Sequence, residues 1–113
     1  MELGTISPKL LDKKLLSGEK LTLIDVREHH EREICSIQVP QGVVDLHIPM
    51  AEVQARLSEI RECPAPIVVY CHHGIRSMVV ARWLAARGVA GLWNLDGGID
   101  SWSSDVDPTV PTY

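Results

Sequence analysis

The chain has 113 residues, of which 45% are hydrophobic and 23% charged, a balance typical of one globular domain. Its formal net charge of −4 argues against a nucleic-acid-binding protein, and no apolar run reaches the roughly 18 residues that a membrane span needs. The three cysteines are odd in number and lack C-x-x-C spacing, so we expect free thiols in a reducing compartment. The N-terminus lacks a basic and apolar leader, which favours a cytoplasmic location.

Helix and strand signals alternate along the first part of the chain. A helix is predicted from Ser7, which serves as its N-cap, with Pro8 in the first turn and Gly18 beyond the end. The following segments are predicted as a strand over 20–26, a short polar helix over 27–34, and a loop with a short strand over 36–48.

The same alternation continues through the second part. Pro49 opens a segment with apolar residues at helical spacing, and "PIVVYC" is a continuous apolar run, as in a strand buried on both faces. The predicted elements are a helix over 49–61, a strand over 66–71, a helix over 77–87 ended by Gly88, and a strand, Gly-Gly turn and helix over 91–102.

Strands that alternate with helices predict a parallel sheet covered by helices on both faces. In such α/β folds, functional sites form at the carboxyl ends of the strands. Asp25 and Cys71 each stand at the end of a predicted strand. We therefore expect the Cys71 thiol to lie at the edge of the sheet where functional sites form in this class of fold.

The segment around Cys71 differs in charge from the rest of this acidic chain. Residues 63–95 contain no Asp or Glu but include three arginines and two adjacent histidines. A buried segment can lack acids by chance. The alternative is a site that binds an anion.

The turn after Cys71 has the composition of an anion-binding loop. Gly74 permits tight curvature, so successive amides can point inward, and the next helix adds free N–H groups that Ser77 could cap. Such donors stabilise a thiolate, and Arg76 adds a fixed positive charge. This pattern predicts a nucleophilic cysteine, whereas a lone cysteine elsewhere is usually a core residue. A Cys71 packed inward, with the neighbouring N–H groups turned away, would exclude this interpretation.

Three motifs resemble those of the rhodanese sulfurtransferases: "LIDVRE" at 23–28, "CHHGIRS" at 71–77 and "LWNLDGGIDSW" at 92–102. The resemblance spans nearly the whole chain and implies a three-layer α/β fold with a mostly parallel five-stranded sheet. It implies a single rhodanese domain over 1–113, with a core over about 5–104 and an irregular tail over 105–113. Cys35 and Ser36 stand where many members have glycine and histidine, which is a change in the scaffold.

Loop length favours sulfur transfer over the related chemistry of Cdc25-like phosphatases and arsenate reductases. The loop from Cys71 to Arg76 has six residues, as in the sulfurtransferases that it resembles, whereas the loops of the phosphatase-like relatives are one residue longer. A smaller ring suits a sulfane sulfur better than a tetrahedral oxyanion.

The resemblance implies a ping-pong reaction in which Cys71 takes sulfur from thiosulfate or a similar small anionic donor and passes it to cyanide or a thiol. It implies no metal and no cofactor. An alternative is a sulfur carrier that a partner enzyme loads, with a cysteine desulfurase or a thioredoxin-like protein as partner. The residues expected to bind the persulfide are those of the loop, His72, His73, Gly74, Ile75, Arg76 and Ser77.

The neighbouring residues leave several roles open. Arg76 either binds the donor or ties the loop to a carboxylate elsewhere. His72 and His73 are expected to be exposed, where they either assist proton transfer or are simply solvated. Asp25 and Arg27 are expected to support the loop from below. The histidines and cysteines lack the paired spacing of a zinc site, so none is expected.

Overall fold

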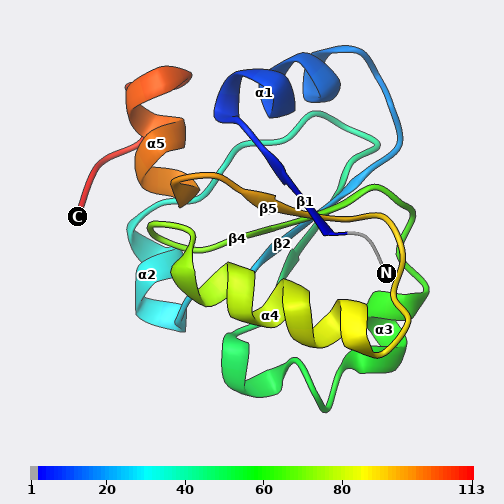
Figure 1. The fold of residues 1–113 in the computed structure, drawn as a ribbon. Helices are drawn as coiled ribbons and strands as arrows, with labels where there is room; N and C mark the ends of the chain where they lie inside the picture. Colours follow the sequence, from blue (N-terminus) through cyan, green and yellow to red (C-terminus); the bar gives the residue numbers. More distant parts are fainter. Residues whose placement is uncertain (1–2) are drawn as a thin grey trace.

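Five parallel strands form one sheet in the computed structural model, which describes residues 3–113 (Figure 1). All neighbouring strands pair in parallel, in the order β1-β5-β4-β2-β3. This sheet confirms the predicted α/β class. The strands are β1 (Leu3–Ile6), β2 (Thr22–Asp25), β3 (Val44–His47), β4 (Ile67–Tyr70) and β5 (Leu92–Leu95).

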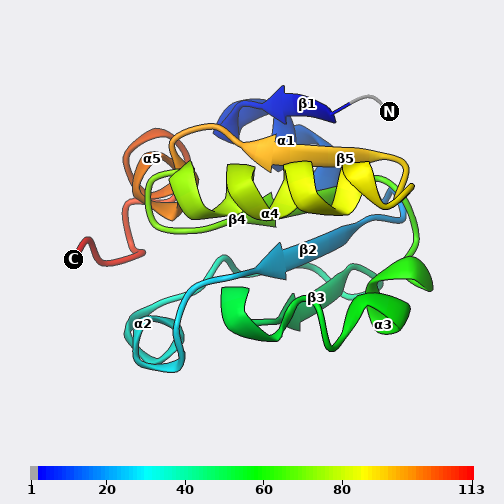
Figure 2. The ribbon, with the colours of Figure 1, turned by 60° about the horizontal axis from the view of Figure 1, so that its bottom comes forward.

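Helices cover both faces of the sheet (Figures 1 and 2). Helices α1 and α5 pack together on one face, whereas α4 lies on the other beside the short 3-10 helix η1. Within residues 3–113, none of the helices is long and apolar enough to cross a bilayer. The helices are α1 (Pro8–Leu16), α2 (His29–Ile34), η1 (Met50–Glu52), α3 (Leu57–Arg61), α4 (Ile75–Ala86) and α5 (Gly98–Asp105).

The inner strand β4 divides its side chains between two cores. Ile67 and Val69 pack in the cluster under α4, whereas Val68 and Tyr70 pack in the cluster under α1 and α5. Successive side chains of a strand point to opposite faces, so a strand between two helical layers must be apolar throughout. The continuous apolar run of β4 therefore fixes the position of the loop that follows it.

Three elements differ from the sequence prediction. The sequence does not predict strand β1, because its four residues carry no clear alternation. The predicted helix over 49–61 is divided into η1 and α3, and Arg56 binds Glu52 and Glu59 across the break. Helix α4 begins at Ile75, two residues earlier than predicted.

Candidate active site

The loop after β4 is clamped against the start of α5. The amides of Ile99 and Asp100 donate to the carbonyl oxygens of Cys71 and His72, at 2.9 and 3.0 Å. A Cβ atom at position 98 would collide with the same two carbonyls, so only glycine fits there. The two loops at the carboxyl ends of β4 and β5 therefore form one rigid unit.

The sulfur of Cys71 accepts hydrogen bonds from the loop backbone. The N–H groups of Gly74 and Ser77 lie 3.1 and 3.3 Å from Sγ. Cys71 itself is packed inward and only 1% exposed, which is the first of the two features that together would exclude a nucleophile. The neighbouring N–H groups nevertheless point toward the sulfur and are not turned away from it. The second feature that would exclude a nucleophile is therefore not observed.

Ser77 does not cap α4, contrary to the prediction. The helix starts earlier, with Gly74 as N-cap in a left-handed conformation, and Ser77 lies inside the first turn, fully buried. The Ser77 hydroxyl donates to Asn94 Oδ1 at 2.5 Å and lies 3.3 Å from Cys71 Sγ. Because a hydroxyl has one proton, its oxygen is left to accept the S–H of a neutral Cys71.

Asn94 on β5 is a site residue that sequence reasoning missed. Its Nδ2 donates to the carbonyl oxygen of Gly74 at 3.2 Å, and its Oδ1 accepts from Ser77. It therefore holds the loop at both ends of the amide ring. The signal was present in the sequence, because a polar residue in the apolar run "LWNL" needs a partner when it is buried.

Arg76 points away from the sulfur and binds Glu31 on α2. The two side chains form a bidentate pair at 2.7 and 2.8 Å, and the Glu31 side chain is 8% exposed. The hydrogen bonds that Arg76 donates hold the pKa of Glu31 well below its usual range. The same hydrogen bonds, accepted by Glu31, raise the pKa of Arg76. Of the two roles left open for Arg76, this geometry corresponds to the tie between loop and carboxylate.

Asp25 and Arg27 form a fully buried pair beside the loop. Nε and Nη2 of Arg27 donate to the two carboxylate oxygens of Asp25 at 2.9 and 2.8 Å. Arg27 also donates to the carbonyl of Cys35, at 2.7 Å, and to the hydroxyl of Tyr113, at 2.9 Å. Each of the three guanidinium nitrogens of this arginine is therefore engaged within the protein.

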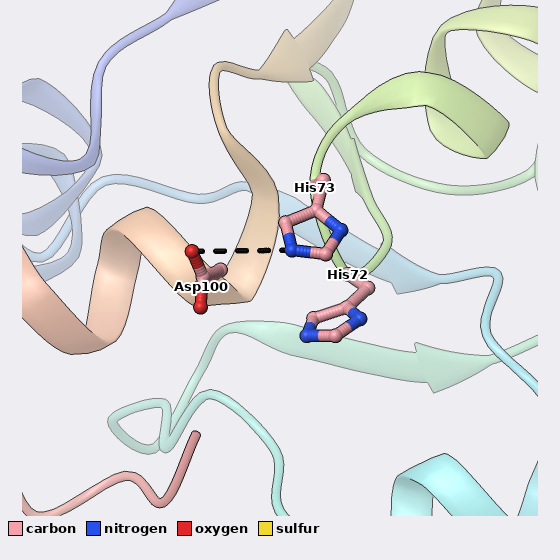
Figure 3. Close-up of side chains that lie close together, drawn as sticks. All are labelled: His72, His73 and Asp100. Atoms are coloured by element: carbon pink, nitrogen blue, oxygen red, sulfur yellow. Dashed lines mark ion pairs between the residues drawn. The ribbon is translucent and has the colours of Figure 1, made fainter. Parts of the chain in front are cut away.

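His72 is half-buried, contrary to the exposed position predicted for it. Its ring lies between the rings of His73 and Tyr113, each with a centroid distance of 3.8 Å. Burial lowers the pKa of His72, and the neighbouring His73 lowers it further. His73 is 59% exposed, as expected, and its Nε2 lies 4.0 Å from Asp100 Oδ2 (Figure 3).

Tyr113 connects the end of the chain to the site. Its hydroxyl donates to Glu31 at 2.9 Å and accepts from Arg27, while its ring stacks on His72. Burial raises the pKa of Tyr113 to about 12, so the phenol is protonated at neutral pH. No local pattern in the proline-marked tail could have indicated these contacts.

A pocket of about 390 Å³ opens beside the loop, on the side of α4. The exposed Ile75 side chain and the guanidinium of Arg82 line it. Cys63 and Trp102 take no part in this edge: Cys63 donates its S–H to the carbonyl of Glu59, and Trp102 is buried in the core. The chemistry available at this edge is therefore that of a thiol, a ring of amides and a nearby pocket whose lining includes one arginine, Arg82, and one carboxylate, Asp96.

Comparison with known proteins identifies one relative of matching length and several longer ones. The model of the rhodanese-like domain family matches residues 7–105. The putative sulfurtransferase YtwF of Bacillus subtilis is 33% identical over 108 residues, which cover 96% of this chain and 98% of YtwF. The putative sulfur carrier protein YrkF of the same species is 35% identical over 102 residues, which cover 90% of this chain and 52% of YrkF.

Solved structures agree with these sequence matches. A rhodanese-like domain protein from Staphylococcus aureus superposes with a TM-score of 0.77 at 25% identity, over 97% of this chain and 98% of that chain. Other curated relatives are longer proteins, and this chain spans between 21% and 31% of their length.

Proposed function

Because the chain belongs to the family of rhodanese-like domains, we propose that it transfers sulfane sulfur from thiosulfate or a similar small anionic donor to cyanide or a thiol acceptor, through a persulfide on Cys71. The family is one of sulfurtransferases and sulfur carriers. The observation that supports the proposal is the pair of N–H groups, from Gly74 and Ser77, directed at Cys71 Sγ.

The proposed reaction has two steps that exchange one sulfur atom. The Cys71 thiolate attacks the outer sulfur of thiosulfate, a new S–S bond forms, and sulfite leaves with the electron pair of the bond that breaks. Cyanide or a thiolate then attacks the outer sulfur of the persulfide. Thiocyanate or a new persulfide leaves, and the electron pair returns to Cys71 as thiolate.

The backbone is assigned the electrostatic part of this reaction. The negative charge lies on Cys71 Sγ before the first attack and returns to it in the second step, and the fixed amides of Gly74 and Ser77 stabilise that charge without reorganisation. Arg76 contributes indirectly, because its charge is already paired with Glu31. The donor is expected to approach from the pocket that Ile75, Arg82 and Asp96 line, where Arg82 forms no ion pair with a carboxylate of residues 3–113 and can bind an anion.

The experiment is a thiocyanate assay with thiosulfate and cyanide. We expect turnover by the wild type and none by Cys71→Ala, while Cys63→Ala, a matched change of a half-buried thiol outside the loop, retains activity. Mass spectrometry of the thiosulfate-treated protein is expected to find one added sulfur atom on Cys71, removable by cyanide. A folded wild type that neither turns over nor gains sulfur would refute the proposal.

A sulfur carrier is the second candidate, favoured by one structural observation. Cys71 is 1% exposed, so the loop must make room for the outer sulfur, and a docking protein can supply the energy for that change better than a small donor. The relative YrkF is named a putative sulfur carrier protein. Fast loading of Cys71 by a cysteine desulfurase, against slow loading by thiosulfate, would favour the carrier over the enzyme.

A further inference from the structure

Three potential metal ligands converge at the edge of the loop, and none of them is hydrogen-bonded to Cys71 Sγ within residues 3–113. His72 and His73 follow Cys71, and Asp100 lies in the first turn of α5. One ligand atom of each residue lies within 4.8 Å of the others. In Figure 3 the two imidazole rings lie one above the other, and each presents a nitrogen toward Asp100.

His72 supplies an independent observation. Its Nε2 is buried and has no hydrogen-bond partner in the described part of the chain. Leaving a buried polar atom without a partner costs about 1–3 kcal/mol, so such an atom needs an explanation, and an ion or a bound water is a common one. The ring cannot simply rotate outward, because it is held between His73 and Tyr113.

We propose that His72, His73 and Asp100 bind one divalent transition-metal ion of the Zn²⁺ type. Two imidazoles and a carboxylate form a ligand set typical of Zn²⁺, with a fourth position open to solvent, whereas Mg²⁺ and Ca²⁺ prefer oxygen ligands alone. The three atoms must move closer to surround an ion. The side chains of His73 and Asp100 are 59% and 42% exposed, so they can rotate without any backbone shift.

The site was not expected from the sequence, because its ligands lack the paired spacing of a structural zinc site. The fold brings the ligands together although their spacing in the sequence is irregular. The amides of Ile99 and Asp100 tie α5 to the carbonyls of Cys71 and His72, so residues far apart in the chain are held together by backbone bonds. His72 is a preorganised ligand, and the two exposed side chains complete the set.

The ion would act on the sulfur-transfer loop, and this part of the inference rests on the proposed function. A metal that joins His72 and His73 to α5 resists the widening that the inward Cys71 needs in order to hold an outer sulfur. Zn²⁺ is therefore expected to slow sulfur transfer, and a chelator to restore it.

Metal binding is tested first without the reactive thiol. Cys71→Ser protein is titrated with Co²⁺, followed by its visible absorption, and with Zn²⁺ by calorimetry. We expect one ion per chain, and we expect Asp100→Asn and His73→Asn, each in the Cys71→Ser background, to weaken binding about tenfold or more. His29→Asn is the matched control, because His29 is an exposed histidine 3.5 Å from Glu52 but belongs to no such three-ligand group within residues 3–113.

Circular dichroism verifies that each variant is folded, and both substituted side chains are exposed enough for the fold to persist. Binding that is absent in Cys71→Ser, or unchanged in both ligand variants, would overturn the proposal and leave a bound water as the partner of His72. The activity assay forms a separate arm, whose readout is the ratio of rates with and without Zn²⁺ in the wild type and in Asp100→Asn. A protein that binds the metal but transfers no sulfur would therefore refute the proposed function and leave the metal site intact.

Discussion

The ends of β2 and β4 are neighbours in the sheet, but their polar groups have different partners. After β2, charged side chains neutralise one another: Asp25 binds both Arg27 and Arg32. After β4, main-chain N–H groups converge on one sulfur, and the one arginine of the loop, Arg76, is directed away to Glu31. The comparison indicates that paired side-chain charges stabilise the scaffold after β2, whereas backbone N–H groups contact the thiol after β4.

The largest effect is expected at the buried pair after β2. Asp25→Ala leaves the fully buried Arg27 without its carboxylate, which is expected to cost about 3–5 kcal/mol of unfolding free energy. Urea unfolding measures it. Asp45→Ala is the control, because Asp45 pairs with Arg32 at a more exposed position, and we expect a loss of about 1 kcal/mol or less. Equal losses in the two variants would remove the distinction between buried and surface charge.

The Arg76–Glu31 pair connects the two regions and is expected to be pH-dependent. The pKa of Glu31 is lowered in the folded protein, so its carboxylate stabilises the fold fully above the unfolded pKa of about 4.3, and this contribution is lost as the pH falls. Glu31→Gln is therefore expected to lose about 2 kcal/mol at neutral pH and progressively less in acid.

Denaturant unfolding of wild type and Glu31→Gln between pH 3 and pH 7 checks this sign. The gap in stability is expected to narrow steadily below about pH 4.3. A gap that stays constant, or widens in acid, would show that Glu31 does not act as a charged partner of Arg76.

The hydroxyl of Ser77 tests whether the loop after β4 depends on more than its backbone. Ser77→Ala removes the bond to Asn94, which also binds the carbonyl of Gly74 in the loop, and we expect sulfur transfer to slow about tenfold, the value of one hydrogen bond. Ser103→Ala also removes a buried serine bond, to Val110, but far from the sulfur. Steady-state assays compare the sulfur-transfer rates of the two variants, and we expect the larger loss in Ser77→Ala. An equal loss of activity in both would assign Ser77 a merely structural role.

The smallest effect is expected at Tyr113. Tyr113→Phe keeps the ring that stacks on His72 but removes the hydroxyl between Arg27 and Glu31, which is expected to cost about 1 kcal/mol or less. Thermal unfolding measures this loss. Tyr113→Ala removes the stacking as well and should lower stability further; identical transitions for the two variants would mean that the ring contributes nothing.

How far the sequence predicts the molecule depends on the range of each interaction. The apolar run of β4 and the turn residues after Cys71 are local signals, so the parallel α/β fold and the position of the loop followed from them. Glu31 lies 45 positions from Arg76, and nothing in either segment specifies the other. The same holds for Tyr113 on His72, and for Asp100 beside His73, which only the packed sheet brings together.

Burial reversed two of the local expectations. Ser77 has the residue type of an N-cap, but an earlier start of α4 placed it inside the helix, where its hydroxyl had to find Asn94. His72 was expected in solvent, yet the tail of the chain covers it. In both cases the local sequence predicted one environment for a polar side chain, and a segment distant in the sequence supplied a different one.

The inward position of Cys71 also bears on how its thiol survives oxidants. Peroxide attacks accessible thiolates and drives them through sulfenic acid to sulfinic and sulfonic acids, the last of which cannot be reversed. A sulfur enclosed by its own loop is shielded from that attack. The same enclosure that makes loading with sulfur demanding thus protects the thiol that we propose as the nucleophile.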